Sequence, residues 1–407
     1  MQQQELIPHL FRAEYAKICA VLTRFFGIEH LEVAEDIASE TFLLALETWS
    51  YKGIPQNPVA WLYVVAKNKA KNCMQRNKRF AKKVAKAIQN DATVHTSIID
   101  LSEQNIADSQ LQMLFTLCHP VIPVEAQIGL SLRILCGFGI DEIATAFLTN
   151  KETIYKRLFR AKEKLREEKI AIQLPAVHEM KKRVDVVLTT LYLLFNEGYY
   201  SESNDAILRE ELCTEAMRLM YLLMNNEQTN VPEVNALYAL MCFHASRFPA
   251  RKNGSGAMVL YEQQDETLWN YELIATGAYY LNRSSQGNYI SKYHLEAGIA
   301  YWHTVKADTS DKWENILQLY NQLLQMAYSP IAALNRTFAL AKVKGKAVAI
   351  AEAEKLKLTN NHYYFTLLGE LYTDIDNNNA KHCFEKAILL AKTGADKSVL
   401  TQKMNNF

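Results

Sequence analysis

The feature that most constrains the fold is a helical periodicity that continues through almost the whole chain. Apolar residues recur at helical intervals, and no stretch shows the two-residue alternation bounded by turns that marks a strand. Only nine prolines occur in 407 residues, so few positions would interrupt a helix. We therefore expect an all-α protein, with N-terminal helices near residues 8–27, 31–50, 57–88, 110–118, 123–137, 141–148 and 151–169.

Two breaks divide the chain before its midpoint. Residues 89–108 are polar and weakly periodic, which is typical of a linker, and Pro175 follows a charge-rich helix end. Beyond Pro175 comes a series of amphipathic helices separated by turn-forming segments. The length favours two to four domains.

The end of the chain carries the pattern of one helical repeat. The first-helix spacing of a tetratricopeptide unit is matched by Phe365, Leu368, Gly369 and Tyr372. The second-helix spacing is matched by Ala380, Phe384 and Ala387, with a turn that is one residue short. We expect a repeat-like helical domain, because the neighbouring helices have similar sizes and pair in a similar way.

Several classes of protein receive no support. No apolar run reaches the roughly 20 residues of a membrane span, and the N-terminal stretch lacks an apolar signal core, so we expect a cytoplasmic protein without membrane contact. The seven cysteines are scattered without a CxxC pair, and the histidines show no metal-ligand spacing. We expect no metal, no cofactor and no catalytic residues, and an enzyme is the least favoured reading.

Charge alternates in blocks behind a net charge of +1. Residues 1–50 hold eight acidic and three basic side chains, whereas residues 61–90 hold nine basic and no acidic ones. Residues 87–108 are acidic again. Such blocks indicate surfaces that meet different partners.

An acidic stripe marks the helix expected at residues 31–50. Four carboxylates fall within about 80° on a helical wheel, beside Leu43: Glu32, Asp36, Glu40 and Glu47. Small and apolar residues form the opposite, packing face. The stripe is either a solvated helix face or a docking surface for a basic partner helix.

The helix expected at residues 57–88 has a basic face with interspersed amides. Lysine and arginine neutralise phosphates, asparagine pairs with base edges, and an aromatic ring stacks on an unpaired base. We expect nucleic-acid contact from Tyr63, Lys67, Asn68, Lys71, Asn72, Arg76 and Arg79. Trp61 is either buried in the helix packing or in contact with DNA.

Residues 141–169 have the pattern of a helix-turn-helix: a short helix, a tight turn at 149–151 and a longer second helix. Ile154, Leu158, Ala161 and Leu165 would pack the second helix down. Its outward side suits the major groove, and we expect DNA contacts from Thr153, Tyr155, Lys156, Arg157, Arg160 and Lys164. The alternative is an ordinary helical hairpin with surface charge.

Taken in order, these surfaces resemble a bacterial sigma-70-like RNA polymerase sigma factor of the extracytoplasmic-function type. AEDIASETF resembles the polymerase-docking motif of region 2, although the family often has Gln where this chain has Ser39. NPVAWLYVVAKNKAKN resembles the segment that melts and reads the −10 element. The stretch EAQIGLSLRILCGFGIDEIATAFLTNKETIYKRLFRAKEKLR resembles region 4, with Lys151 and Glu152 where the family has small residues.

Further segments, among them LYLLFNEGYY, LMCFHASRFPAR and SPIAALNRTFALA, resemble a subgroup with a long tetratricopeptide-like C-terminal extension. The resemblance implies region 2 at 1–88, a linker at 89–108, region 4 at 109–170, a helical extension at 175–285 and a tetratricopeptide-like domain at 286–407. It also implies core RNA polymerase and promoter DNA as partners, with an unknown protein or ligand at the C-terminal domain.

The spacing of the modules fits this interpretation. A 20-residue extended linker spans about 65–70 Å, which suits two modules that read DNA elements about two helical turns apart. Two alternatives stay open. One is a helix-turn-helix regulator that needs no polymerase docking, and the other is a tetratricopeptide scaffold whose basic helices are only surface.

Overall fold

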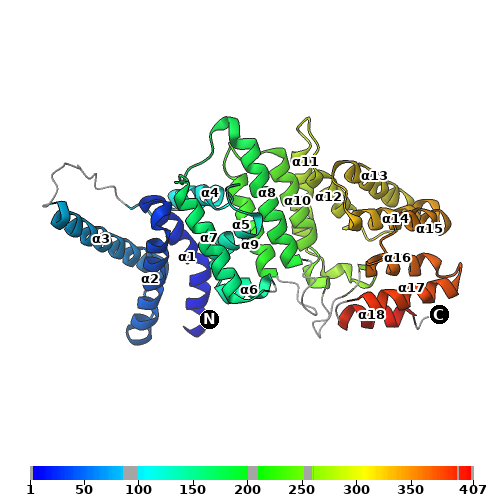
Figure 1. The fold of residues 1–407 in the computed structure, drawn as a ribbon, viewed down its shortest axis with the longest axis horizontal. Helices are drawn as coiled ribbons and strands as arrows, with labels where there is room; N and C mark the ends of the chain where they lie inside the picture. The colour runs from blue at the N-terminus through cyan, green and yellow to red at the C-terminus, as the bar shows by residue number, and fades with distance from the viewer. Residues whose placement is uncertain are drawn as a thin grey trace. The chain divides into compact units, whose positions relative to one another are not determined.

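The computed structural model describes residues 3–85, 99–147, 149–199, 210–251, 259, 261–391 and 394–404. All regular secondary structure in these ranges is helical, which confirms the predicted all-α class (Figure 1). The described residues form two compact units. The first reaches to Leu194 and includes Tyr221–Leu223, and the second holds the remainder.

The first unit contains α1 to α7 and most of α8. Their bounds are α1 Gln3–Phe26, the short 3-10 helix η1 Ile28–His30, α2 Leu31–Lys52, α3 Pro58–Ala85, α4 Glu103–Leu117, α5 Val124–Leu135, α6 Ile140–Ala146, α7 Lys151–Glu167 and α8 Val177–Tyr199. Six of the seven predicted N-terminal helices begin within a few residues of these positions, and the exception is α4.

The predicted linker at 89–108 is wrong at its C-terminal end. Ile99 is buried, α4 begins at Glu103, and Ile106 packs into the same core as α1, α2 and α3. The carboxylate of Asp100 accepts hydrogen bonds from the backbone N–H and the hydroxyl of Ser102, which orders the turn before the helix. Glu103 and Gln104, two polar residues of the predicted linker, are exposed on this helix. Residues 86–98 lie outside the described ranges.

Small residues bring α1, α2 and α3 together. Ala34, Ala38 and Ala45 of α2 are fully buried, as are Leu62 and Ala66 of α3. Alanine occupies little space, so the neighbouring helices approach closely and the larger side chains fill the remaining core. This packing fixes which faces of α2 and α3 point outward.

The helices α5, α6 and α7 form a second packed group. Ile154, Leu158 and Leu165 of α7 are buried, as predicted from their spacing. A Cβ atom at Gly129 of α5 would lie 2.9 Å from a Leu158 methyl carbon, so the glycine allows α5 and α7 to pack closely. The side chain of Asn150 caps α7 by accepting a hydrogen bond from the Thr153 N–H at 2.8 Å.

The second unit is a series of short helices: α9 Glu210–Met224, α10 Pro232–Ala245, α11 Tyr271–Ser284, α12 Lys292–Trp302, α13 Ser310–Met326, α14 Pro330–Lys344, α15 Lys346–Lys355, α16 His362–Tyr372, α17 Asn377–Leu390 and α18 Gly394–Met404. Three 3-10 turns lie between α10 and α11: η2 Phe248–Arg251, η3 Tyr261–Gln263 and η4 Glu266–Leu268.

The predicted repeat residues meet in the helical hairpin of α16 and α17. Ala380, Phe384 and Ala387 of α17 are buried, and the ring of Phe384 lies against Gly369 of α16. A Cβ atom at Gly369 would be 2.9 Å from two ring carbons. The small residues of the hairpin therefore lie at the helix contact, as their spacing indicates. The assignment to tetratricopeptide repeats and the finer domain boundaries stay predictions.

Candidate docking and nucleic-acid surfaces

The outward face of α2 presents the five residues of the predicted acidic stripe: Glu32, Asp36, Glu40, Leu43 and Glu47. We call these five the α2 docking face. All five are exposed, and Leu43 has 54% of its surface accessible. Leu46 and Tyr51 on the same helix are also exposed apolar residues, which sequence reasoning missed. Carboxylates around exposed apolar side chains are suited to a partner that is both basic and apolar.

Two members of the α2 docking face are engaged within the chain. Glu40 accepts a hydrogen bond from the ammonium group of Lys69 on α3 at 2.7 Å. Glu32 pairs with the guanidinium of Arg166 on α7 at 2.6 Å. In the described part of the chain, no cation lies within ion-pair distance of Asp36 or Glu47.

The outward face of α3 carries most of the predicted cations and amides. Asn68, Lys71, Asn72 and Arg76 are exposed, and Lys67 is half-buried. No described acidic group pairs with Lys71 or Arg76, so their charges are open to an anionic partner. The side chain of Arg79 lies outside the described residues. The face is suited to phosphate contact along a nucleic-acid backbone.

Tyr63 differs from the rest of the predicted α3 set, because its side chain is turned toward α1. Its hydroxyl donates a hydrogen bond to Glu14 at 2.5 Å, and Glu14 is buried with Lys17 as a second partner at 2.8 Å. Burial and the Glu14 carboxylate raise the pKa of Tyr63. Trp61 is half-buried and packs edge-on against Trp49 at 5.4 Å between ring centroids, in agreement with the packed alternative.

The outward side of α7 is basic and aromatic. Lys156 and Arg160 are exposed, Arg157 is half-exposed, and no described carboxylate pairs with any of the three. Tyr155 and Phe159 are 63% and 53% exposed, and their rings stack at 6.4 Å.

Two members of the predicted α7 set make local contacts that leave them less available. Lys164 pairs with Glu168 at 2.7 Å, and Thr153 is half-buried with its N–H in the Asn150 cap.

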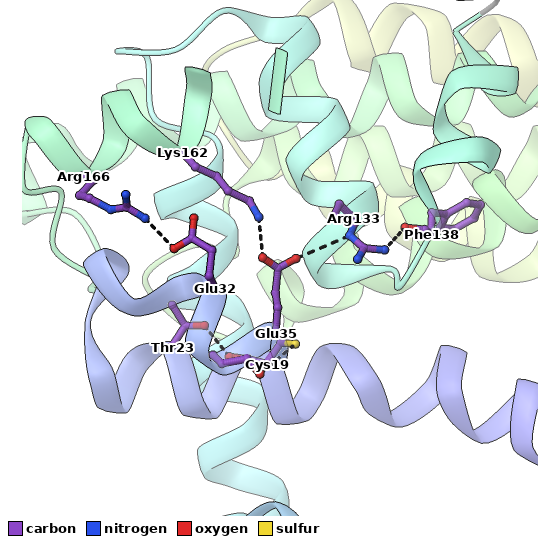
Figure 2. A network of polar contacts seen from close by, with 9 residues as sticks. Cys19, Thr23, Glu32, Glu35, Arg133, Phe138, Lys162 and Arg166 are labelled. Atoms are coloured by element: carbon purple, nitrogen blue, oxygen red, sulfur yellow. Dashed lines mark hydrogen bonds and ion pairs between the residues drawn. The ribbon is translucent and has the colours of Figure 1, made fainter. Parts of the chain in front are cut away.

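A polar network joins α2 to α5 and α7 (Figure 2). Its centre is Glu35, which is only 8% exposed and was not among the predicted site residues. One carboxylate oxygen pairs with the ammonium group of Lys162 at 2.5 Å, and the other lies 3.5 Å from Nε of Arg133. In the sequence, Glu35 stands between Ala34 and Ile37 on a helix face that is otherwise apolar. A carboxylate on a buried face needs a cationic partner, so this position is the sequence signal that could have identified Glu35.

The second unit has a cluster of aromatic rings and cations around Tyr261. The guanidinium of Arg247 lies 5.4 Å from the Tyr261 ring centroid, and Lys312 donates to the Tyr261 hydroxyl at 3.2 Å. Burial, together with the nearby positive charges of Arg247 and Lys312, lowers the pKa of His303 to about 3. This histidine is therefore neutral at pH 7 and packs as an aromatic ring.

The described residues contain no group of three or more His, Cys, Asp or Glu side chains placed to hold a metal ion. No helix within the described ranges is both long enough and apolar enough to span a membrane.

Two segments match known families. Residues 10–91 match Sigma-70 region 2, and residues 183–285 match a family of unknown function, DUF6596. The first match covers α2, α3 and most of α1, and the second begins inside α8.

Two curated proteins are similar to the chain. The uncharacterized protein R00370 of Rhizobium meliloti is 31% identical over 392 residues, which is 95% of this chain and 92% of that protein. The ECF RNA polymerase sigma-E factor of Haemophilus influenzae is 28% identical over 160 residues, which is 38% of this chain and 82% of that protein. No solved structure matches.

Proposed function

This chain is a sigma-70-like factor that belongs to the same family as R00370 of Rhizobium meliloti, and on that premise we propose that it is a sigma factor of the extracytoplasmic-function type. It binds core RNA polymerase and directs transcription initiation at specific promoters. The observation that carries the proposal is the separation of surfaces on the first unit. The α2 docking face is acidic and apolar, whereas the outward faces of α3 and α7 are basic.

In this proposal, the α2 docking face binds core polymerase. Asp36 and Glu47 are exposed without a described cationic partner, and Leu43 adds an apolar contact beside them. The face lies within the segment that matches Sigma-70 region 2. Carboxylates around an exposed leucine complement a basic helix of a partner.

The basic faces divide the promoter between them. On α3, Asn68 and Asn72 contact the −10 bases while Lys71 and Arg76 hold phosphates, so that a base leaving the stack is captured by binding energy. The chain has no GxxxxGK[ST] phosphate loop that would supply ATP hydrolysis for melting. On α7, the exposed cations read the −35 element as the second helix of a helix-turn-helix.

The second unit is a regulatory domain in this proposal. Helical repeats present surfaces to partners, and the paired small helices of α16 and α17 fit a tetratricopeptide-like arrangement. Its ligand is an unidentified protein or small molecule. In vitro transcription with and without the second unit measures whether this unit restrains or assists the first unit.

The test is in vitro transcription with core polymerase, this protein and the DNA upstream of its own coding sequence. The expected result is specific initiation that Asp36→Ala/Glu47→Ala abolishes through lost core binding. Lys71→Ala/Arg76→Ala retains core binding but loses promoter opening. Lys182→Gln, an exposed cation on α8 outside all three surfaces, serves as the control. Tight duplex binding without any polymerase association would instead support the helix-turn-helix regulator.

A further inference from the structure

The second unit contains buried positive charge that no described carboxylate neutralises. Arg247, just after α10, is 8% exposed, and Lys312 in the first turn of α13 is 1% exposed. Arg251 of η2 and Lys306, which precedes α13, are half-buried. Within the described residues, none of these four cations forms an ion pair. Because a buried cation loses its hydration, it ordinarily requires an anion as a partner.

Three of these cations surround the ring of Tyr261. The charged groups of Arg247, Lys306 and Lys312 lie 5.4, 5.2 and 5.4 Å from the ring centroid. The two lysines are already hydrogen-bonded. Lys306 donates to three backbone carbonyls in and just after η3, and Lys312 donates to the Tyr261 hydroxyl and to one backbone carbonyl. The lysines therefore supply positive charge, while most of their own donors are used.

The two arginines keep donors available. Arg247 donates from Nη2 to the Tyr199 hydroxyl at 3.3 Å, but its Nε is buried and has no hydrogen-bond partner among the described residues. The guanidinium of Arg251 lies 3.9 Å from the Tyr199 ring centroid, and within the described ranges it forms no hydrogen bond. Guanidinium groups bind phosphate and carboxylate oxygens through parallel N–H donors. This pair of arginines is therefore suited to an oxyanion.

Two further buried polar atoms beside these cations have no hydrogen-bond partner among the described residues. They are Nε1 of Trp269, which is 4% exposed, and Oε1 of Gln264, which is 7% exposed. The Trp269 ring stacks on Tyr261 at 6.3 Å between centroids, and the Gln264 backbone N–H donates to the Tyr261 carbonyl at 3.2 Å. Because buried polar groups are nearly always hydrogen-bonded, these two atoms and Nε of Arg247 around one tyrosine indicate a ligand that satisfies them.

We propose that the residues around Tyr261 form a binding site for a small molecule that carries an oxyanion group, a phosphate or a carboxylate. The guanidinium groups of Arg247 and Arg251 donate to the oxyanion. The buried N–H of Trp269 donates to a further oxygen of the ligand, and a hydroxyl or amine of the ligand donates to Gln264. The proposal goes beyond the proposed function, because it gives the second unit a ligand of stated chemistry and needs neither polymerase nor DNA.

The first experiment is isothermal titration of the full-length protein with inorganic phosphate and, separately, with citrate, in chloride buffer of matched ionic strength. We expect saturable binding of at least one probe, and the tighter of the two tells whether the oxyanion is a phosphate or a carboxylate. Arg251→Gln should weaken this binding on the order of tenfold, because it removes a charge-assisted hydrogen bond. Arg283→Gln is the matched control, since Arg283 is an exposed arginine of α11 outside the site, and it should leave the affinity unchanged.

The second experiment follows thermal unfolding of the second unit with and without the tighter probe. With the probe about fivefold above its dissociation constant, we expect the melting temperature of the wild-type unit to rise by about 2–4 °C. Arg247→Met replaces the buried cation by an apolar side chain of similar length, and it should lose this rise whatever its own melting temperature. Arg251→Gln, at a half-buried position, gives the same comparison if Arg247→Met does not fold.

Two results overturn the oxyanion site. One is the absence of saturable binding of both phosphate and citrate to the wild-type protein. The other is a probe affinity and a rise in melting temperature that are the same in Arg251→Gln, Arg283→Gln and wild type. Neither experiment contains polymerase or promoter DNA. A protein that binds the probe at this site but does not initiate transcription therefore overturns the proposed function and leaves the oxyanion site in place.

Discussion

Replacing Tyr63 with phenylalanine tests whether the hydroxyl of this residue stabilises the fold through Glu14. The substitution keeps the aromatic ring and removes the hydroxyl that donates to Glu14 at 2.5 Å. A hydrogen bond to a charged acceptor contributes about 1.5–3 kcal/mol. Tyr63 is half-buried and Lys17 still pairs with Glu14, so the loss falls at the low end, about 1–2 kcal/mol. For a unit of about 200 residues this lowers the melting temperature by about 2–8 °C.

The assay is thermal unfolding of the full-length protein, followed by transcription at a temperature at which the variant is folded. Tyr51→Phe is the matched control, because Tyr51 is 93% exposed and its hydroxyl has no described partner. We expect Tyr63→Phe to be less stable and fully active below its transition, and Tyr51→Phe to be unchanged in stability. A Tyr63→Phe protein as stable as wild type would refute the assignment of the hydroxyl to Glu14.

Arg157→Ala should weaken binding to −35 duplex DNA by about 1–3 kcal/mol if the guanidinium reads a base, and an unchanged promoter preference in a binding titration contradicts that role. Gly369→Ala should destabilise the second unit by about 1–3 kcal/mol in thermal unfolding, because the new Cβ meets the Phe384 ring at 2.9 Å. Gly298→Ala is the control, because its Cβ meets only the flexible end of a leucine side chain, and its unfolding free energy should change less. The pKa of His303 is depressed to about 3, so stability should fall by up to about 1.4 kcal/mol per pH unit as pH drops from about 6.5 toward 3. Urea unfolding at pH 7 and pH 5 measures this, and an equal fall in His303→Phe would show that another group is responsible.

Local patterns in the sequence predicted the features that depend on local spacing. The buried stripe of Ile154, Leu158 and Leu165 and the exposure of Lys156 and Arg160 follow from helical periodicity alone. The small residues of the α16–α17 hairpin were recognisable for the same reason, since each packing position recurs at a helical interval.

Contacts between distant residues could not be predicted in this way. Tyr63 and Glu14 are 49 positions apart, and Lys162 and Glu35 are 127 positions apart. Periodicity places a side chain on a face of its helix but does not specify which helix that face meets. For this reason periodicity groups Tyr63 with the nucleic-acid residues and assigns Glu35 to no predicted surface. The start of α4 is not predicted by periodicity, because Ile106 and Ser109 are the buried residues among its first seven.

The position of α8 determines how parts of such proteins could be exchanged. Its residues up to Leu194 belong to the first unit, where the Thr190 hydroxyl donates to Gln127 of α5 at 2.9 Å and Arg183 donates to the Phe115 carbonyl at 2.5 Å. The match to the family of unknown function nevertheless begins at residue 183. A chimera joined at residue 175 would therefore set α8 of one parent against α4 and α5 of the other. Joining after Leu194 keeps these native contacts, so chimeras made there should fold more readily than those joined at the proline.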